Sequence, residues 1–278
     1  MQLNRQEVDD FINRALAEDI GRGDLTTNTT IPMGTTLKAS MVARQDLVVC
    51  GIEIAALPFT RVNKEIKVEI KVSDGTKAAK GTALAVVEGD ARAVLAAERT
   101  ALNILQHLSG IATEVRKYVE AVEGTGCTMI DTRKTIPGLR NLAKYASFIG
   151  GARNHRLRLD DGVLIKDNHI AAAGSLTETV KRAMRGTPAL TVVEVECDTL
   201  EQVKEAAESG VDMILLDNMD VDNLKKAVEV VAGRCRIECS GGVTLETVHA
   251  KAMTGVDFIS SGRMTQSAPA VDIGLDWG

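Results

Sequence analysis

Residues 191–217 read TVVEVECDTLEQVKEAAESGVDMILLD: a short apolar strand, an amphipathic helical stretch and a second apolar strand. The second half of the chain repeats this unit, and its apolar strands are CTMID, VLIK, TVVEVE, DMILLD, RIECSG and DFISSG. Strands that alternate with helices favour a parallel sheet with right-handed crossovers, either closed into a barrel or left open. We therefore expect an α/β barrel domain over residues 109–278.

The first part of the chain has a different pattern. Residues 1–20 have the apolar spacing of an amphipathic helix, and from Thr36 onward the segments LKASMVARQDLVVCG, IKVEIKV and ALAVVEG read as strands. Residues 91–110, ARAVLAAERTALNILQHLSG, predict a further helix. Residues 1–108 therefore predict a separate, small α+β domain.

The composition fits a globular protein and excludes several classes. Hydrophobic residues make up 45% of the chain and the formal net charge is −5. No segment has the apolar run of a signal peptide or the roughly 20 apolar residues of a membrane span, so we expect a cytoplasmic protein with no membrane partner. The five cysteines form none of the CxxC pairs typical of zinc or redox sites. An acidic balance and few aromatic residues argue against a nucleic-acid partner.

One basic stretch interrupts this acidic chain, between Asp131 and His169. It holds eight Lys or Arg residues against four Asp and no Glu. Two of its runs, CTMIDTRK and GVLIKDNH, put cations directly after strand-like apolar residues, so these charges are expected at strand ends, where they point at a ligand. The alternatives are a solvated basic surface and a basic patch that binds RNA or DNA.

In α/β barrels the chemistry lies at the carboxyl ends of the strands. Here nearly every such end carries charged, Ser or Gly residues: Asp131-Thr132-Arg133-Lys134, Lys166-Asp167-Asn168-His169, Glu194-Val195-Glu196, Asp217-Asn218, Ser240-Gly241-Gly242 and Ser261-Gly262-Arg263. The ends with cations come first, those with carboxylates next, and the Ser/Gly turns last. Several such ends on one rim indicate a site.

Each part of the rim favours one kind of ligand. The two Ser/Gly turns predict a phosphate held on backbone N–H groups, although the alternative for each is a tight βα turn. Glu194 and Glu196 share one face of their strand, and with Asp217 they suit Mg²⁺ or sugar hydroxyls, or else ion pairs with the rim's own cations. The cations are too many for one phosphate, and Arg recognises carboxylates by bidentate hydrogen bonds. The rim therefore predicts a barrel that joins a phosphosugar to a small poly-acid, assisted by Mg²⁺.

At this point several motifs carry a resemblance to a known family: EDIGRGDLTT, ERTALNILQHLSGIAT, DTRKTIPGLR, NHRLRLDDGVLIKDNH, EVEC, ILLDN, ECSGGVT and GVDFISSG. The chain resembles the quinolinate phosphoribosyltransferases, the decarboxylating nicotinate-nucleotide pyrophosphorylases, over nearly its whole length. DTRKTxPGLR followed by LIKDNH is the most specific part. The resemblance implies that quinolinate and phosphoribosyl pyrophosphate give nicotinate mononucleotide, pyrophosphate and carbon dioxide, in NAD biosynthesis.

The resemblance also implies an architecture and an assembly. It implies an α/β protein with an amino-terminal α+β sandwich domain, residues 1–108, followed by a partly open α/β barrel of parallel strands, residues 109–278, which carries the catalytic site. The chain's last residues are allowed to return to the first domain. The partners implied are quinolinate and phosphoribosyl pyrophosphate, together with a second copy in a homodimer with a shared active site. A hexamer of such dimers is the larger assembly that the resemblance allows.

The family's site residues carry over motif by motif. Around the two quinolinate carboxylates the resemblance places Arg99, Arg133, His155, Arg156 and Lys166, with Arg99 reaching across the dimer. Thr132 and Lys134 accompany Arg133, and Lys134 lies near the pyrophosphate. Glu196 and Asp217 meet the ribose hydroxyls and the shell of the Mg²⁺ cofactor, through water and substrate. Ser240, Gly241, Gly242, Ser261, Gly262 and Arg263 hold the 5-phosphate, and the catalytic residues are Lys134, Lys166, Glu196 and Asp217.

Three residues depart from the family pattern that we expect: Arg263 and Arg158, where small or neutral residues are expected, and Cys239 before Ser240. Three other functions stay open. The first is a paralogous pyrophosphorylase or a nicotinate-type phosphoribosyltransferase on the same fold. The second is a Schiff-base aldolase that uses Lys134 or Lys166. The third is a nucleic-acid-binding patch formed by the basic stretch. For Arg99, the competing interpretation is a solvent-exposed ion pair with Glu98.

Overall fold

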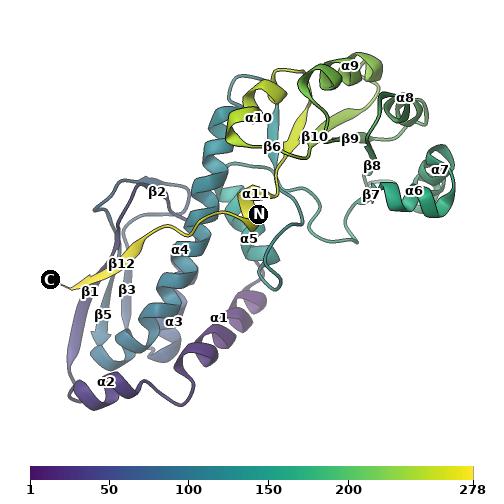
Figure 1. Cartoon of the computed structure of the whole chain (residues 1–278). Helices are drawn as coiled ribbons and strands as arrows, with labels where there is room; N and C mark the ends of the chain where they lie inside the picture. The colour runs from purple at the N-terminus through teal and green to yellow at the C-terminus, as the bar shows by residue number, and fades with distance from the viewer. Residues whose placement is uncertain (278) are drawn as a thin grey trace. The chain divides into compact units, whose positions relative to one another are not determined.

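The structure is a computed structural model that describes residues 1–277 (Figure 1). The chain forms two compact units. The first comprises residues 1–116, 141–150 and 268–278, and the second comprises residues 117–140 and 151–267. The expected boundary after residue 108 therefore falls inside a helix, and the segment 141–150 was not expected in the first unit.

The first unit is built around a four-stranded antiparallel sheet of order β12-β1-β5-β3. Its strands are β1 (Thr36–Ala43), β3 (Lys67–Ile70), β5 (Ala83–Asp90) and β12 (Ile273–Trp277), and β2 (Leu47–Val48) pairs separately with β4 (Lys77–Ala78). Figure 1 shows β12, the last strand of the chain, beside β1. The chain's last residues thus return to the amino-terminal sheet.

Five helices accompany this sheet. They are α1 (Arg5–Ile20), α2 (Leu25–Thr30), α3 (Ile52–Val62), α4 (Ala91–Ala121) and α5 (Arg140–Gly150). The Asp90 carboxylate accepts the Ala93 N–H at 2.9 Å and so caps the start of α4. Gly110 lies inside α4, where a Cβ atom would come within 2.2 Å of the Pro269 carbonyl oxygen, so only glycine lets the carboxyl-terminal segment approach this helix.

The second unit contains the six predicted strands in one parallel sheet of order β6-β11-β10-β9-β8-β7. They are β6 (Thr128–Ile130), β7 (Val163–Ile165), β8 (Val193–Cys197), β9 (Met213–Asp217), β10 (Arg236–Ser240) and β11 (Phe258–Ser260). The connecting helices are α6 (Asp167–Ala173), α7 (Leu176–Gly186), α8 (Leu200–Glu208), α9 (Val221–Val231), α10 (Leu245–Ala252) and α11 (Arg263–Gln266). Side-chain oxygens of Ser175, Thr199 and Asp220 cap α7, α8 and α9.

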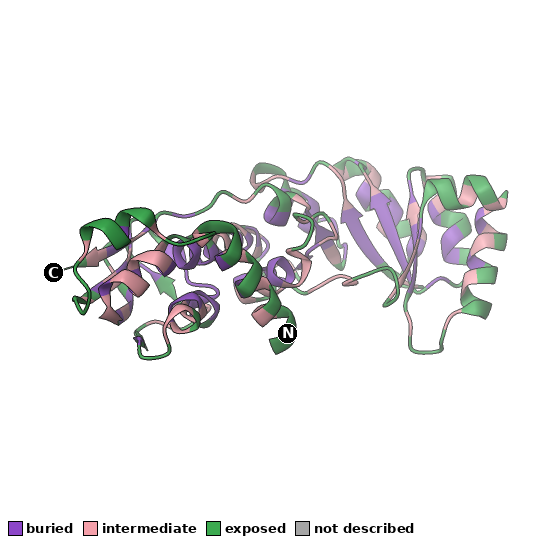
Figure 2. Ribbon diagram, turned by 90° about the horizontal axis from the view of Figure 1, so that it is seen from below, coloured by how far each residue is buried: buried purple, intermediate pink, exposed green. Residues whose placement is uncertain are grey.

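Period-2 alternation divides each strand between two environments. Val193, Val195 and Cys197 are buried beneath the surrounding helices, whereas Glu194 and Glu196 face the other side of the sheet. Figure 2 shows buried strands beneath helices whose outer faces are exposed. Because the interior carries charged as well as apolar side chains, the barrel interior is itself a place where chemistry can occur.

The sheet is open between β6 and β7, since no pairing joins these edge strands within residues 1–277. The segment 153–156 instead lies beside β6: Arg153 forms a parallel bridge with Ile130, and its backbone bonds Met129 and Asp131. Among the described residues no helix is both long and apolar enough to cross a bilayer.

Candidate active site

Strand register brings the Lys166 and Glu196 side chains together. Ile165 pairs with Val195, so the next residue of each strand, Lys166 and Glu196, lies side by side on the interior face. The Lys166 ammonium donates to a Glu196 carboxylate oxygen, and 45% of the Lys166 side chain is exposed against 11% of Glu196. This is one of the alternatives foreseen for the carboxylates, an ion pair with the rim's own cations. A Lys held in an ion pair is a poor Schiff-base nucleophile.

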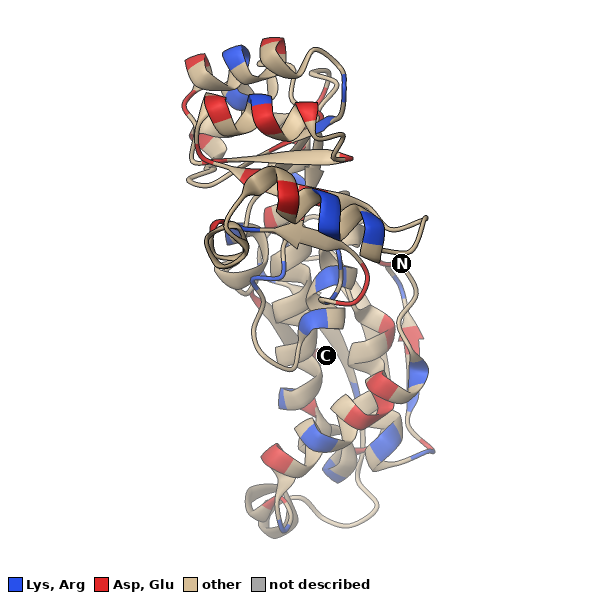
Figure 3. Ribbon diagram, turned by 90° about the vertical axis from the view of Figure 1, so that its right-hand side faces the viewer, with Lys and Arg blue, Asp and Glu red and all other residues tan. Residues whose placement is uncertain are grey.

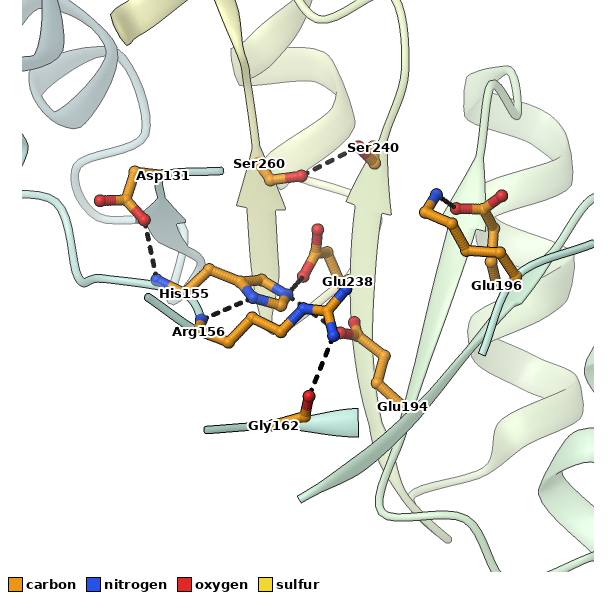
Figure 4. A network of polar contacts seen from close by, with 10 residues as sticks. Asp131, His155, Arg156, Gly162, Glu194, Glu196, Glu238, Ser240 and Ser260 are labelled. Carbon is orange, nitrogen blue, oxygen red and sulfur yellow. Dashed lines mark hydrogen bonds and ion pairs between the residues drawn. The ribbon is translucent and has the colours of Figure 1, made fainter. Parts of the chain in front are cut away.

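Asp131 organises the segment beside β6. It is fully buried, and its two oxygens accept the His155 N–H at 2.9 Å and the Asn154 side-chain amide at 2.7 Å. This fixes the imidazole of His155 between Glu194 and Glu238, as Figure 4 shows. His155 Nε2 lies 2.9 Å from Glu194 and 3.4 Å from Glu238. Both carboxylates are almost completely buried, with 3% and 1% of their side chains exposed.

One buried proton is expected in this cluster. Burial, and then the charge of Glu238, raise the pKa of Glu194 to about 7. Burial alone lowers the pKa of His155, but its hydrogen bonds to Glu194 and Glu238 outweigh burial and raise it. The Arg156 N–H lies 2.7 Å from Nδ1, which opposes a second ring proton, so the extra proton is better placed on the carboxylate pair.

The same three side chains have metal-ligand spacing, since one ligand atom of each lies within 4.8 Å of the others. His155 Nδ1 accepts a backbone N–H, so the ring proton belongs on Nε2, the atom that would have to bind an ion. The arrangement therefore fits a proton-sharing cluster better than a metal site.

Substitution of Glu238 should reveal the proton on Glu194 through the pH dependence of protein stability. The folded protein retains on Glu194 a proton that the unfolded chain releases near pH 4.5, so the stabilisation from this group is lost as the pH rises from about 4.5 to 7. Glu238→Gln should lower the pKa of Glu194. As the pH rises from 5 to 8, we expect the free energy of unfolding of the variant to increase by about 1–2 kcal/mol relative to that of wild type. Thermal unfolding of both proteins at the two pH values measures this difference, and Glu178→Gln is the surface control. An equal change in stability between the two pH values for wild type and Glu238→Gln would contradict the prediction.

Arg133 and Arg156 form a second group of predicted residues that the structure brings together. Burial lowers the pKa of Arg156, and the nearby charge of Arg133 lowers it further. Arg156 also donates from Nη1 to the Gly162 carbonyl at 3.0 Å, which fixes its direction. The Nε of Arg133 is buried and donates no hydrogen bond within the described residues. Two cations so close, one with an unsatisfied donor, are suited to an anionic ligand.

The Ser/Gly turns lie against neighbouring strand ends. Gly241 has φ +81°, and a Cβ atom there would come within 2.7 Å of the Asn218 backbone nitrogen. The Ser260 hydroxyl donates to the Ser240 hydroxyl at 2.9 Å across β10 and β11. Gly262 is in contact with the side chain of Lys134, because an added Cβ would meet Lys134 Cδ at 2.6 Å. The turns are therefore close-packed against Asn218 and Lys134 at neighbouring strand ends.

The two glycines of the first turn should differ sharply when replaced by alanine. Gly241→Ala combines a left-handed backbone with a collision against Asn218, whereas Gly242→Ala, at φ +59°, meets nothing within 4 Å. We expect about 1 kcal/mol of destabilisation for Gly242→Ala from backbone strain, and at least about 2 kcal/mol more for Gly241→Ala. Urea unfolding measures both. Equal losses would show that the close approach to Asn218 does not matter.

The remaining predicted residues are placed as follows. Thr132 accepts the Lys134 N–H at 3.0 Å and so shapes the first strand end. Asp217 is half-buried at the end of β9 and accepts from the Asn218 amide at 2.6 Å. The Ser261 hydroxyl is buried and donates to the Val243 carbonyl at 3.3 Å, and Arg263 is exposed at the start of α11. Arg99 is exposed on α4, in the first unit, so the geometry within the second unit does not include it.

Two features of this site add to the sequence prediction. His155 is predicted beside the substrate carboxylates, and in the structure its ring nitrogens contact Glu194 and the Arg156 backbone N–H, so it also positions Arg156. Glu238 was missed. The available signal was the alternation in RIECS, which puts Glu238 on the face of Ser240, as TVVEVE puts Glu194 on the face of Glu196.

Comparisons with known proteins identify the family of this chain. Residues 24–109 and 111–276 match the sequence models described as the N-terminal and C-terminal domains of quinolinate phosphoribosyl transferase. The chain belongs to the quinolinate phosphoribosyltransferase family. It is 44% identical to the nicotinate-nucleotide pyrophosphorylase [carboxylating] of Mycobacterium leprae, over 96% of this chain and 96% of that protein. It is 39% identical to a probable enzyme of that name from Bacillus subtilis, over 99% of this chain and 94% of that protein.

Solved structures of quinolinate phosphoribosyltransferase relatives have the same fold. NadC from Streptococcus pyogenes superposes with a TM-score of 0.95 at 38% identity, over 99% of this chain and 98% of that chain. Nicotinate-nucleotide pyrophosphorylase from Ehrlichia chaffeensis gives 0.94 at 43% identity, over the whole of both chains. The predicted fold class, an amino-terminal α+β sheet domain followed by an open parallel-strand α/β barrel, is confirmed.

Proposed function

We propose that this protein transfers the phosphoribosyl group of phosphoribosyl pyrophosphate to quinolinate and releases carbon dioxide, giving nicotinate mononucleotide and pyrophosphate for NAD biosynthesis. The proposal rests on family membership at about 40% identity over the whole chain. The single structural observation that supports it best is the proximity of Arg133 and Arg156, a doubly cationic position suited to a diacid.

The cationic part of the rim binds and orients the acid in this proposal. Arg133 and Arg156 bind the quinolinate carboxylates, and the His155 ring holds the Arg156 backbone through Nδ1. Lys166, paired with Glu196, adds a third cation at the carboxyl end of β7. Bidentate Arg–carboxylate pairing fixes the ring nitrogen in place for attack on the ribose.

The carboxylate part acts on the sugar. Breaking the bond between ribose C1 and the pyrophosphate oxygen develops positive charge on the sugar, which Glu196 and Asp217 stabilise, and negative charge on the departing pyrophosphate, which Lys134 stabilises. The ring nitrogen becomes cationic when it bonds to ribose. That charge stabilises the carbanion left at the adjacent ring carbon when the carboxylate leaves as carbon dioxide, and a proton from water then completes the C–H bond of the product. No covalent nucleophile from the protein is required.

Mg²⁺ is the cofactor that we propose. Glu196 and Asp217 lie at the ends of the neighbouring strands β8 and β9, and carboxylate oxygens are its preferred ligands. Glu196 is already paired with Lys166, so the two carboxylates would hold the ion through water and substrate oxygens rather than alone. When bound, Mg²⁺ supplies positive charge to the pyrophosphate.

The assembly remains part of the proposal as well. We propose a homodimer in which Arg99 of one copy completes the acid pocket of the other. We also propose that the protein is cytoplasmic. A nucleic-acid partner is not favoured, because the net charge is −5 and basic and acidic residues are interspersed on the side of the molecule that Figure 3 shows.

Substrate discrimination tests the assignment against a nicotinate-type enzyme. Wild-type protein with phosphoribosyl pyrophosphate is assayed with quinolinate and with nicotinate, and nucleotide products are resolved by chromatography. We expect a kcat/KM at least about 100-fold higher for quinolinate, since nicotinate leaves one charged donor unpaired. Comparable rates with both acids would favour the nicotinate-type alternative.

A further inference from the structure

A cavity of about 610 Å³ lies at the end of the barrel opposite the rim. Its walls include the amino-terminal residues of four strands, Val163, Val193, Met213 and Arg236, together with Phe258 at the start of β11. Of the residues that the sequence singled out for the site, His155, Arg156 and Glu194 line it. The cavity therefore meets the proposed acid pocket at Arg156 and extends from there to the amino-terminal ends of the strands, away from the rim.

Strand register explains this separation. One row of paired residues across β8, β9 and β10 consists of Glu194, Met213 and Arg236. The row two residues further toward the carboxyl ends consists of Glu196, Leu215 and Glu238. The His155 imidazole binds Glu194 and Glu238, so this layer of polar side chains lies between the cavity and the rim. Glu194 forms part of the cavity wall, and its Oε1 atom is buried without a hydrogen-bond donor in the described chain.

Two cations of the cavity wall, Arg153 and Arg236, lie beside the ring of Phe258. The guanidinium groups of Arg153 and Arg236 lie 5.6 and 6.0 Å from the centre of the Phe258 ring, and neither forms an ion pair with any residue from 1 to 277. Each carboxylate of the wall has a partner other than these two arginines: Asp161 accepts two backbone N–H groups at 2.6 and 2.8 Å, Asp212 accepts the Val193 N–H at 2.8 Å, and Glu194 lies 2.9 Å from His155 Nε2. The N–H edges of the two guanidinium groups remain suited to an anion.

The opposite wall is apolar. It comes from the loop between α7 and β8, where Pro188, Ala189, Leu190 and Val192 line the cavity. Leu190 is fully exposed, at 101% of its reference area, and Val192 is 50% exposed. The wall therefore has an apolar part, suited to an apolar group of a ligand, and a cationic part, suited to an anionic group.

We propose that this cavity is a second ligand site, for a small organic anion with an apolar body. The anionic group binds Arg153 and Arg236, and the apolar body lies against Pro188, Leu190 and Val192. The proposal depends on the cavity alone and holds whether or not the assignment of the reaction at the rim is correct.

Fluorescence titration with 8-anilinonaphthalene-1-sulfonate, an apolar anion, tests the site on the full-length wild-type chain. We expect one saturable site. The double variant Arg153→Ala/Arg236→Ala should weaken binding about tenfold or more, because both charge-assisted bonds are lost. Leu190→Asp should weaken it as well, and since that side chain is fully exposed the variant should fold normally. Arg182→Ala, which removes an exposed charge of α7 outside the cavity, is the matched control and should change nothing.

Two results would overturn the second site. Unchanged affinity in the double variant would show that the dye binds elsewhere. Complete competitive displacement of the dye by quinolinate would show that the cavity belongs to the site at the rim.

Discussion

Arg133→Ala should lower kcat/KM for quinolinate by about 10²- to 10⁴-fold, the largest loss that we expect from a single substitution. The proposed ligand carries two carboxylates, and removal of one guanidinium leaves a buried carboxylate without its charged donor, which costs about 3–5 kcal/mol. Steady-state kinetics with varied quinolinate measures the loss. Thermal stability should stay constant or rise, because Arg133 destabilises the protonated form of Arg156 in the unliganded protein.

Two further variants make the Arg133 result specific. Arg158→Ala removes an exposed guanidinium that pairs with Asp160 at 3.1 Å, and it should leave kcat/KM within about threefold of wild type. Arg133→Lys retains the charge without the bidentate geometry and should restore only part of the activity. Equal kinetics for Arg133→Ala and Arg158→Ala would remove Arg133 from the acid pocket.

Lys166→Ala should reduce kcat by about 10²- to 10³-fold at saturating substrates. The substitution removes a cation from the rim and leaves Glu196 without its ion-pair partner, so the charge balance around both substrates changes where bonds are made and broken. Because almost half of the Lys166 side chain is exposed, we expect normal folding. Single-turnover kinetics separates this effect from product release.

Lys181 offers the matched control for Lys166. It is exposed to a similar degree, 55%, and pairs with Glu178 at 3.3 Å on α7. Lys181→Ala should leave kcat unchanged, since an exposed ion pair contributes little. A Lys166→Ala enzyme within about twofold of wild type would assign Lys166 to the solvated surface instead.

The parallel sheet could be predicted because its signal is local. Six short apolar strands, each followed by a helical stretch, leave few arrangements, and the alternation in TVVEVE already predicted that Glu194 and Glu196 share a face. The strand register then follows from pairing, so the contact between Lys166 and Glu196 is a consequence of two neighbouring strand ends.

The roles of His155 and Glu238 could not be predicted in this way. Their contact joins positions 83 residues apart across the interior of a barrel, and no spacing along the chain encodes it. The return of residues 141–150 to the first unit has the same origin, because it depends on tertiary packing rather than on a local pattern, whereas the return of the last residues as β12 is one that the family resemblance allowed. Helix α4 also continues past residue 110, the last residue of the predicted helix, and Gly110 inside it allows the Pro269 segment to approach.

The most direct test of the account is the release of labelled carbon dioxide from quinolinate that carries ¹³C in the carboxyl group next to the ring nitrogen. Purified wild-type protein is given this substrate and Mg²⁺, with and without phosphoribosyl pyrophosphate. We predict labelled carbon dioxide and pyrophosphate in equal amounts, and none of either without the phosphoribosyl donor. Release that does not depend on the donor, or nucleotide formation without labelled carbon dioxide, would contradict the account.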